Sequence, residues 1–341
     1  MSGCHGNCGR SMCRNDEQLG SVEEHGFEVA PSGRLQLKAD PSTGIESPSE
    51  RKGTVLITGG AGSLGKILAL YYAGTGHTVR VLDINEGELA SLDHPGVRKL
   101  YGSVCSPERL ALAMNGVDLC IHTAALKNLD VSEYNVEDLV ATNIQGTLNV
   151  ARAAMDAGVR AAVFISTDKA VEPTTAYGAS KQMGERIWLW ANRVSRASKF
   201  VVFRSGNFWQ SKGNVFEVWK RQVAVGGPLT VTHPDMKRYF IRIDRAVELI
   251  AQAVRQADGG DIIVPHMPEH QIGDLAREMF PGVPIRVTGL RPGEKMVERL
   301  MTDDERRVAV EGKGWYRIPW LARPAYPSVK SPRGDDEGVR P

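Results

Sequence analysis

The stretch from Thr54 to Asn85 constrains the fold more than any other part of the sequence. It reads TVLITGGAGSLGKILALYYAGTGHTVRVLDIN, which is an apolar run, a glycine-rich turn, an amphipathic run and a second apolar run. This order predicts a buried strand, a tight turn, a helix and a second strand. Such a beginning is typical of chains that go on as alternating strands and helices.

Three of the glycines in the turn lie three residues apart, between the predicted strand and helix. The first glycine permits the tight turn, the second lets the backbone approach a pyrophosphate, and the third lets the helix pack on its strand. In this context the spacing indicates a dinucleotide-binding site. The residues expected to contact the cofactor here are Gly59, Gly62, Ser63, Leu64 and Gly65.

The second predicted strand ends at Asp83, where a carboxylate can accept hydrogen bonds from both ribose hydroxyls of a dinucleotide. The carboxylate would repel a 2′-phosphate, and no arginine follows it immediately, so the sequence favours NAD while leaving NADP possible. Ala124 and Ala125 end a later strand where the cofactor would lie. Their small size suits close approach of the cofactor, although simple packing between helix and strand would explain them equally well.

Strands and helices continue to alternate through the middle of the chain. Strands are expected at Lys99–Tyr101, Val117–Ala125 and AVFIS, and helices from Pro107, over Val136–Ala157 and from Tyr177. Alternation of this length predicts an α/β fold, a Rossmann-type doubly wound parallel sheet with right-handed crossovers. A smaller C-terminal substrate-binding lobe is expected to follow it.

Composition divides the chain into four segments. Residues 1–52 are rich in Gly, Ser, Pro and charge and predict a disordered or loosely docked extension. Residues 53–210 form the predicted NAD-binding Rossmann domain. Residues 211–321 are expected to form mainly the substrate lobe, interleaved with the last elements of the sheet. Residues 322–341 predict a flexible tail.

Charge and hydropathy exclude several classes of function. The 341-residue chain has 42 basic and 40 acidic side chains, a formal charge of +2, so no overall field draws it to nucleic acid. No apolar run reaches the length of a membrane helix, and the first residues contain no apolar signal core. These features predict a cytoplasmic enzyme that binds neither nucleic acid nor membrane.

Five cysteines, an odd number in a large chain, do not indicate a disulfide framework. Three of them lie with His5 in the first thirteen residues, where they could hold a soft metal. Their spacing matches no common zinc pattern, so no metal site is predicted.

The stretch ISTDKAVEPTTAYGASK carries two kinds of proton-transfer chemistry. Tyr177 and Lys181 lie four residues apart and share a face if they enter a helix, where an ammonium group favours the phenolate. Thr167, Asp168 and Lys169 follow an apolar run that would deliver them to the carboxyl edge of the sheet. A strand, a surface turn and a helix with a solvated lysine would produce the same pattern without any chemistry.

Taken together, these motifs resemble the extended short-chain dehydrogenase/reductase superfamily. The stretches AALKNLDVSEYNVEDLVATNIQGTLNV, ISTDKAVEPTTAYGASK, RSGNFWQSKGNVF and LRPGEK are similar, in the same order, to the inverting UDP-N-acetylglucosamine 4,6-dehydratases of the CapD-like polysaccharide biosynthesis family. The resemblance covers about residues 53 to 320.

The resemblance implies a reaction in which C4 of the sugar is oxidised, water leaves across C5 and C6, and the hydride returns to C6. Tyr177 would then act as base for the C4 hydroxyl, with Lys181 lowering its pKa and Thr167 bonding the same hydroxyl. Lys169 would take the C5 proton, provided that its surroundings keep some of it neutral, and protonated Asp168 would donate to the departing C6 hydroxyl. Retaining relatives carry Glu where Lys169 stands, so the lysine favours inversion at C5.

The resemblance also suggests five substrate-binding residues, which are Lys127, Asn207, Arg238, Arg291 and Glu294. An arginine suits the diphosphate of a UDP-sugar. For Lys127 a solvated loop lysine is an equal alternative, and a turn followed by the start of a helix would also explain the RPGEK segment. Family resemblance suggests a homo-oligomer.

Three other functions remain open from the sequence. A UDP-sugar 4-epimerase of the same fold would need Tyr177, Lys181 and the cofactor, but neither Asp168 nor Lys169. A 5,6-dehydratase would stop before the final return of hydride. A non-catalytic protein could bind NAD and UDP-sugars without turning them over.

Overall fold

The structure is a computed structural model that describes residues 27–29, 35–37, 52–195, 197–209 and 211–319. In the N-terminal segment, β1 (Phe27–Val29) and β2 (Leu35–Leu37) pair in antiparallel fashion, which the sequence pattern did not indicate. The rest of the predicted extension up to residue 51, its cysteine cluster and the predicted tail at 322–341 lie outside the described residues.

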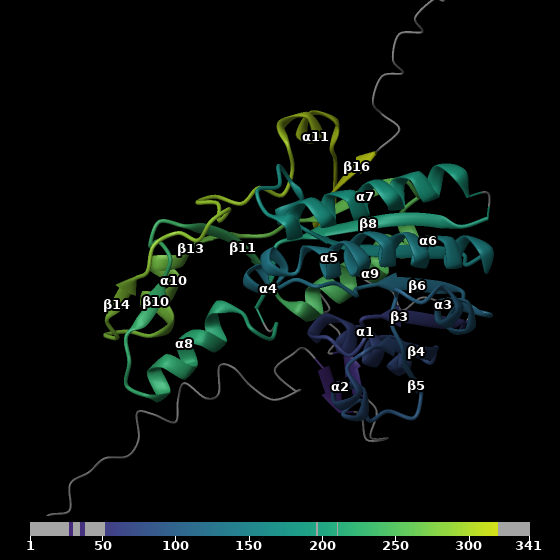
Figure 1. The fold of residues 1–341 in the computed structure, drawn as a ribbon, viewed down its shortest axis with the longest axis horizontal. Helices are drawn as coiled ribbons and strands as arrows, with labels where there is room; N and C mark the ends of the chain where they lie inside the picture. The colour runs from purple at the N-terminus through teal and green to yellow at the C-terminus, as the bar shows by residue number, and fades with distance from the viewer. Residues whose placement is uncertain (1–26, 30–34, 38–51, 196, 210, 320–341) are drawn as a thin grey trace, which may run out of the picture.

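A nine-stranded sheet forms the centre of the molecule, with strand order β15-β16-β12-β8-β7-β6-β3-β4-β5 (Figure 1). All neighbouring strands from β12 to β5 run parallel, whereas β15 and β16 are antiparallel to their neighbours. The doubly wound parallel sheet is therefore confirmed. The strands are β3 (Thr54–Thr58), β4 (Thr78–Asp83), β5 (Val97–Tyr101), β6 (Leu119–His122), β7 (Ala161–Thr167), β8 (Lys199–Ser205), β12 (Asp261–Pro265), β15 (Val310–Gly312) and β16 (Trp315–Pro319).

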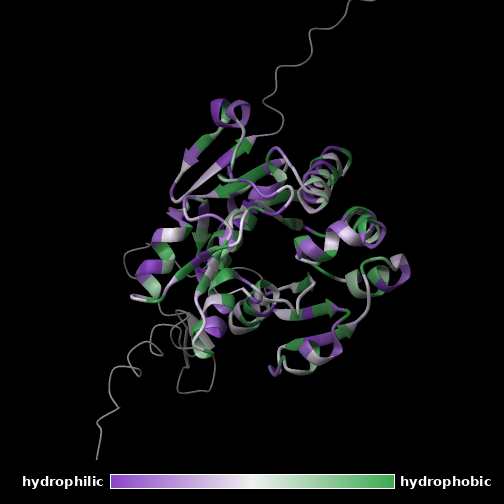
Figure 2. Ribbon diagram, turned by 60° about the vertical axis from the view of Figure 1, so that its left-hand side comes forward, coloured by the Kyte–Doolittle hydropathy of each residue, from purple (hydrophilic) through white to green (hydrophobic). Residues whose placement is uncertain are grey.

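Helices cover both faces of the sheet and bury a separate apolar core on each. One face carries α1 (Ser63–Gly74), α2 (Glu86–Ala90) and α9 (Ile243–Gln256). The other carries α3 (Pro107–Met114), α6 (Gly146–Asp156) and α7 (Ala176–Val194). In Figure 2 the hydrophobic colour is prominent on the strands, while the outer helices carry hydrophilic and hydrophobic residues in turn, as amphipathic helices do.

The strand order reverses between β3 and β6. From β3 the chain goes outward through β4 and β5, then returns to place β6, β7, β8 and β12 on the other side. At such a switch point the loops after the two central strands separate and leave a crevice at their carboxyl ends. The Gly59 turn follows β3 and Thr123 follows β6, so both face this crevice.

The predicted helix over Val136–Ala157 is interrupted by a π-helical segment. It consists of α5 (Val136–Leu139), the π segment Val140–Gln145 and α6. Asn143 in the π segment accepts a hydrogen bond from Leu126 N at 2.8 Å and donates to Leu126 O at 2.9 Å and Ser180 Oγ at 3.0 Å. The π segment thus ties the loop after β6 to helix α7, and π-helical turns often occur at functional sites.

A smaller lobe projects from the carboxyl edge of the sheet, at the left of Figure 1. Its core gathers Phe216, Trp219, Phe240 and six other buried apolar residues. The chain then returns to the main sheet through α9 and β12, and again through α11 (Asp303–Val308), β15 and β16. The lobe contains β9 (Asn207–Phe208), α8 (Val215–Ala224), β10 (Leu229–Val231), β11 (Lys237–Ile241), β13 (Glu269–Gln271), α10 (Ile272–Met279) and β14 (Ile285–Val287).

A buried ion-pair network fixes the C-terminal segment to the sheet. Arg204 on β8 lies between Glu185 on α7, at 2.7 Å, and Glu305 on α11, at 2.8 Å. Ser166 Oγ donates to Glu185 Oε1 at 2.6 Å. Because every partner is hydrogen-bonded, the network can tolerate burial. It anchors α11 and thereby the residues just before it, which reach the candidate site.

Candidate active site

The glycine turn permits an unusually close approach between the ends of β3 and β6. Gly59 has φ +68°, and a Cβ atom there would lie 2.5 Å from the Ala124 N and Cα atoms. A Cβ at Gly65 would lie 2.5 Å from Gly60 Cα. Side chains at either position would therefore push the turn away from the strand or the helix that it packs on.

The N-terminus of α1 opens onto a cavity of about 400 Å³. Gly62 is the N-cap and supplies no side-chain cap, so the first-turn N–H groups are not capped by a side chain at this position and suit an anion. A narrow crevice lined by backbone N–H groups fits the pyrophosphate of a dinucleotide. The cavity is lined by every predicted cofactor residue, which are Gly59, Gly62, Ser63, Leu64, Gly65, Asp83, Ala124, Ala125, Tyr177 and Lys181.

The Asp83 carboxylate is held at the wall of this cavity by two backbone N–H groups. Ala61 N donates to Oδ2 at 3.0 Å and Asn85 N donates to Oδ1 at 2.9 Å. The next residue, Ile84, is exposed and adds no positive charge. The surroundings of Asp83 therefore fit a ribose diol better than a 2′-phosphate.

Tyr177 and Lys181 lie on the first turns of α7, which begins after the N-cap Thr175. Both side chains are buried, with exposed fractions of 9% and 3%. Lys181 Nζ donates to Ile165 O at 2.5 Å and lies 4.1 Å from the centre of the Phe164 ring. Helical spacing thus brings the two groups to the cofactor cavity from one face, as the sequence indicates.

The pKa values of this pair differ from the expectation that Lys181 lowers the pKa of Tyr177. Burial raises the pKa of Tyr177 to about 12, and the charge of Lys169 and a hydrogen bond from Thr167 offset this only in part. Burial also lowers the pKa of Lys181 to about 7, so its positive charge is weakened. In the ligand-free protein Lys181 therefore does not account for the pKa of Tyr177, and its role beside Tyr177 in the reaction stays a prediction.

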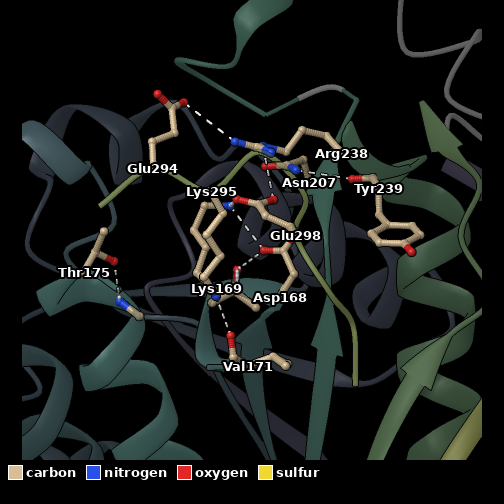
Figure 3. A network of polar contacts seen from close by, with 12 residues as sticks. Asp168, Lys169, Val171, Thr175, Asn207, Arg238, Tyr239, Glu294, Lys295 and Glu298 are labelled. Carbon is tan, nitrogen blue, oxygen red and sulfur yellow. Dashed lines mark hydrogen bonds and ion pairs between the residues drawn. The ribbon is translucent and has the colours of Figure 1, made fainter. Parts of the chain in front are cut away.

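Asp168 and Lys169 follow β7 in a short 3₁₀ turn and meet Glu298 from the C-terminal segment (Figure 3). Lys169 Nζ lies 3.2 Å from Asp168 Oδ1 and 2.9 Å from Glu298 Oε1. Thr167 Oγ1 donates to Asp168 Oδ1 at 2.9 Å. One ammonium group is therefore clamped between two carboxyl groups.

This arrangement sets the protonation of both predicted catalytic groups. Burial would lower the pKa of Lys169, but the charges of Asp168 and Glu298 overcome it and raise the pKa well above the usual range. The expected neutral fraction of Lys169 is thus absent in the ligand-free protein, because its near neighbours are carboxylates. Burial and the charge of Glu298 raise the pKa of Asp168 to about 7, which agrees with a protonated Asp168.

A second cavity, of about 660 Å³, opens between the sheet edge and the smaller lobe. Lys169 and Asn207 line both cavities, so the two spaces meet at these residues. Asp168 has no exposed surface and lines neither cavity. Lys169, rather than Asp168, is therefore the member of the pair that faces the junction.

Three predicted substrate residues line this second cavity beside one another. Glu294 Oε1 lies 3.7 Å from Arg238 and 3.1 Å from Arg291, so it pairs with both guanidinium groups. The RPGEK segment is a turn that does not lead directly into a helix, and α11 begins only at Asp303. Thr174 Oγ1 donates to Gly293 O at 2.6 Å. The two arginines could meet a diphosphate, whereas a carboxylate such as Glu294 is suited to orienting them.

The other predicted substrate residues are placed differently. Asn207 Nδ2 donates to Tyr239 O at 3.3 Å, at the junction of the two cavities. Lys127 is exposed and lines the cofactor cavity, but not the second one. Asn207 therefore faces the second cavity, whereas Lys127 does not, and the substrate contacts of both residues stay predictions.

Sequence reasoning missed Glu298 and Lys295 in the site. Lys295 donates from Nζ to Val171 O at 2.6 Å, and Glu298 contacts Lys169. Both belong to GEKMVERL, directly after the recognised arginine turn. The available signal was an acidic residue four positions after Glu294, which nothing in the sequence links to Lys169.

Fold and site together define an extended short-chain dehydrogenase/reductase. Residues 55–319 match the family described as "Polysaccharide biosynthesis protein", and the chain belongs to this family. The inverting UDP-N-acetylglucosamine 4,6-dehydratase of Campylobacter jejuni is 32% identical over 276 residues, which cover 78% of this chain and 83% of that protein.

Two further comparisons are informative. The UDP-glucose 4-epimerase of Rickettsia rickettsii is 32% identical over 285 residues, covering 79% of this chain and 84% of that protein. The X-ray structure of Pen from Bacillus thuringiensis superimposes with a TM-score of 0.76 at 33% identity, covering 79% of this chain and 90% of that one.

The described residues also limit two other kinds of site. None of their helices combines the length and apolar character that a membrane-spanning segment requires. Within the same residues, no three His, Cys, Asp or Glu side chains are grouped to hold a metal ion.

Proposed function

We propose that the protein is a nucleotide-sugar 4,6-dehydratase, and specifically a UDP-N-acetylglucosamine 4,6-dehydratase that inverts C5. The observation that carries this proposal is the position of Lys169 at the junction of the two cavities, paired with the buried carboxyl of Asp168. Oxidation alone needs no such pair, whereas elimination of water needs a base and an acid near C5 and C6. The similarity to the Campylobacter jejuni dehydratase supports the same substrate.

NAD is the proposed cofactor, bound with its pyrophosphate on the Gly59 turn and a ribose at Asp83. When bound, it supplies the oxidant for C4 and the reductant for C6 within one turnover. Tyr177 and Lys181 line the same cavity and would orient the nicotinamide end. The carboxylate of Asp83 is the basis for preferring NAD over NADP.

The chain's own residues would move three protons. The C4 proton enters at Tyr177 and can reach Asp168 through the Thr167 hydroxyl, which lies 2.9 Å from Asp168 Oδ1. Lys169 takes the C5 proton. Asp168 lines neither cavity, so its proton would reach the departing C6 hydroxyl through the Thr167 hydroxyl, which lines the cofactor cavity. Since Lys169 is charged at rest, it must first pass a proton to a neighbouring carboxylate.

Mass spectrometry of products from a panel of UDP-hexosamines tests this proposal. The dehydratase reading predicts a 6-deoxy-4-keto product, lighter than its substrate by one water, with UDP-N-acetylglucosamine the preferred substrate. A product that keeps its C6 hydroxyl would refute the proposed dehydratase function. A protein that binds NAD and UDP-sugars without any conversion would support a non-catalytic role, and an unsaturated product would indicate a 5,6-dehydratase.

A UDP-sugar 4-epimerase is the second candidate, favoured by the similarity to the Rickettsia rickettsii epimerase. It would use Tyr177 and Lys181 but would leave Asp168 and Lys169 without a catalytic task. The product of an epimerase has the same mass as its substrate, so the same panel separates the two functions.

Assembly into a homo-oligomer and a cytoplasmic location remain predictions. The outer surface of α7 exposes Met183, Trp190 and Val194, which lie along one side of the helix and would be covered in an oligomer. Light scattering of the purified protein would measure its mass and decide between a monomer and an oligomer.

A further inference from the structure

Glu298 joins Lys169 to Arg238 in the network of Figure 3. Its Oε1 lies 2.9 Å from Lys169 Nζ and its Oε2 lies 3.4 Å from Arg238 Nε. The residue is 4% exposed and lines the second cavity, which Asp168 does not. Glu298 therefore contacts both the predicted base and a predicted substrate arginine.

The carboxyl groups of Asp168 and Glu298 each have an unsatisfied oxygen. Among the described residues, no hydrogen-bond donor reaches Asp168 Oδ2 or Glu298 Oε2, apart from the long ion-pair contact of Arg238 with the latter. Two ionised carboxylates buried on the same ammonium group would repel each other, and their free oxygens would be poorly solvated. A proton on one of them removes the repulsion and supplies a donor.

We propose that Glu298 is a positioning residue that shares one proton with Asp168 and holds Lys169 against the pair. This inference rests on the proposed dehydratase function. It gives Glu298 a specific task, which is to keep a transferable proton on Asp168 at neutral pH and to accept the proton that Lys169 must release.

Ionisable groups from four parts of the chain surround Asp168 and Glu298, and the pKa values of the two carboxyl groups agree with this assignment. Burial, repulsion by Glu298 and a hydrogen bond with Glu298 raise the pKa of Asp168 to about 7, against the attraction of Lys169. The pKa of Glu298 is lowered to about 2, because Lys169, the hydrogen bond from Asp168 and Arg238 outweigh its burial. The ionisable neighbours are Lys169 from the 3₁₀ turn, Tyr177 from α7, Arg238 from β11 and Lys295 from the RPGEK turn.

The protons balance over a turnover. At rest Lys169 is charged and the carboxyl pair holds one proton, so two mobile protons are present. A transfer from Lys169 to Glu298 gives a neutral amine and two carboxylic acids. Because the resting pKa of Glu298 is far below that of Lys169, this transfer is unfavourable at rest and the neutral amine is only a transient species. As the C5–H and C6–O bonds break, the amine takes the C5 proton. The proton of Asp168 passes through the Thr167 hydroxyl to the leaving hydroxyl to give water, which restores the resting state.

Return of hydride to C6 is accompanied by return of a proton from Lys169 to C5. The pair and Lys169 are then one proton short. Oxidation at C4 comes first, so Tyr177 must receive the C4 proton as a phenolate, keep it during elimination and pass it on through Thr167 only at this point. The phenolate is then restored, and no net proton is gained or lost by the protein. Glu298 is needed at both transfers because it is the second acceptor beside Lys169.

Glu298→Gln in the purified holoenzyme tests the proposal. An amide donates to the Asp168 carboxylate and removes the like charge, so it should lower the pKa of Asp168. The wild-type elimination rate should fall as pH rises through about 7. In the variant the elimination rate should fall at a lower pH. Elimination at neutral pH should be reduced at least about tenfold, because each unit by which the pKa of Asp168 falls lowers its protonated fraction about tenfold.

Single-turnover measurements separate this role from a structural one. Reduction of the nicotinamide, followed by its absorbance, should keep its rate within about threefold in the variant, and reduced cofactor should accumulate because elimination is slow. Glu298→Asp keeps a carboxylate at this position and should retain part of the upward shift in the pKa of Asp168. Glu269→Gln, which changes a carboxylate that pairs with Lys237 and lines neither cavity, should leave the pH profile of elimination unchanged.

Two results would overturn the proposal. One is an unchanged pH profile in Glu298→Gln, and the other is loss of cofactor reduction together with elimination. Infrared difference spectra of the wild-type protein give a test that needs neither the variant's folding nor dehydratase activity. A protonated carboxyl band that disappears as pH rises through about 7, and that is missing in Asp168→Asn, supports the shared proton. Absence of that band overturns it, whereas failure to form a 6-deoxy-4-keto product overturns the proposed function alone.

Discussion

Replacement of Lys169 by alanine should separate elimination from oxidation. The change removes the ammonium group that lies 3.2 Å from Asp168 and 2.9 Å from Glu298, but leaves the Tyr177 and Lys181 side chains in place. A positioned general base contributes about 10²- to 10⁴-fold in rate, so exchange of the C5 proton should fall by a factor in that range. Oxidation at C4 should fall by less than about tenfold, since Tyr177 keeps its contacts.

The assay combines two signals from one reaction. Absorbance of the reduced nicotinamide follows oxidation at C4, and NMR in heavy water follows deuterium at C5. Lys237→Ala is a matched control, because Lys237 is an exposed lysine of the smaller lobe that also pairs with a carboxylate, Glu269. Exchange at C5 that stays within about tenfold of wild type in Lys169→Ala would refute the role of Lys169 and favour the epimerase.

Three further outcomes are expected. Gly59→Ala should strongly reduce NAD content, measured by chromatography of the cofactor released from the purified protein, because the new Cβ would lie 2.5 Å from Ala124 atoms. Arg204→Met should lower the free energy of unfolding in urea by about 3 to 5 kcal/mol, since it leaves the buried Glu185 carboxylate uncompensated. Burial lowers the pKa of His122 to about 3, so the unfolded chain binds more protons between that value and its ordinary pKa of 6.5. His122 should therefore lower the free energy of unfolding by about 2 kcal/mol between pH 7 and pH 5, measured as the difference between wild type and His122→Gln, because the buried Asp168 titrates in the opposite sense in both proteins.

Local sequence patterns were sufficient to predict the parallel sheet and the residues that line the cofactor cavity. The glycine turn, the strand that ends at Asp83 and the Tyr177 to Lys181 spacing each depend on residues close in sequence, and strand–helix alternation leaves few topologies for a parallel sheet. The family prediction is confirmed by the match over residues 55–319.

The electrostatics of the site could not be predicted in the same way. Glu298 contacts Lys169 although the two residues lie 129 positions apart in the sequence. Two of the predicted protonation states, neutral Lys169 and a Tyr177 made acidic by Lys181, depended on burial that the sequence does not reveal. The π segment at Asn143 also depends on tertiary contacts, because its hydrogen bonds join a loop to a distant helix.

The measurement that tests the account most directly is NMR of the product formed from UDP-N-acetylglucosamine in heavy water. The account predicts a 6-deoxy-4-keto sugar with deuterium at C5 and inverted configuration there. Deuterium at C5 with the configuration of the substrate would contradict the assignment of inversion to Lys169. A sugar that keeps its C6 hydroxyl and carries no deuterium at C5 would contradict the dehydratase function itself.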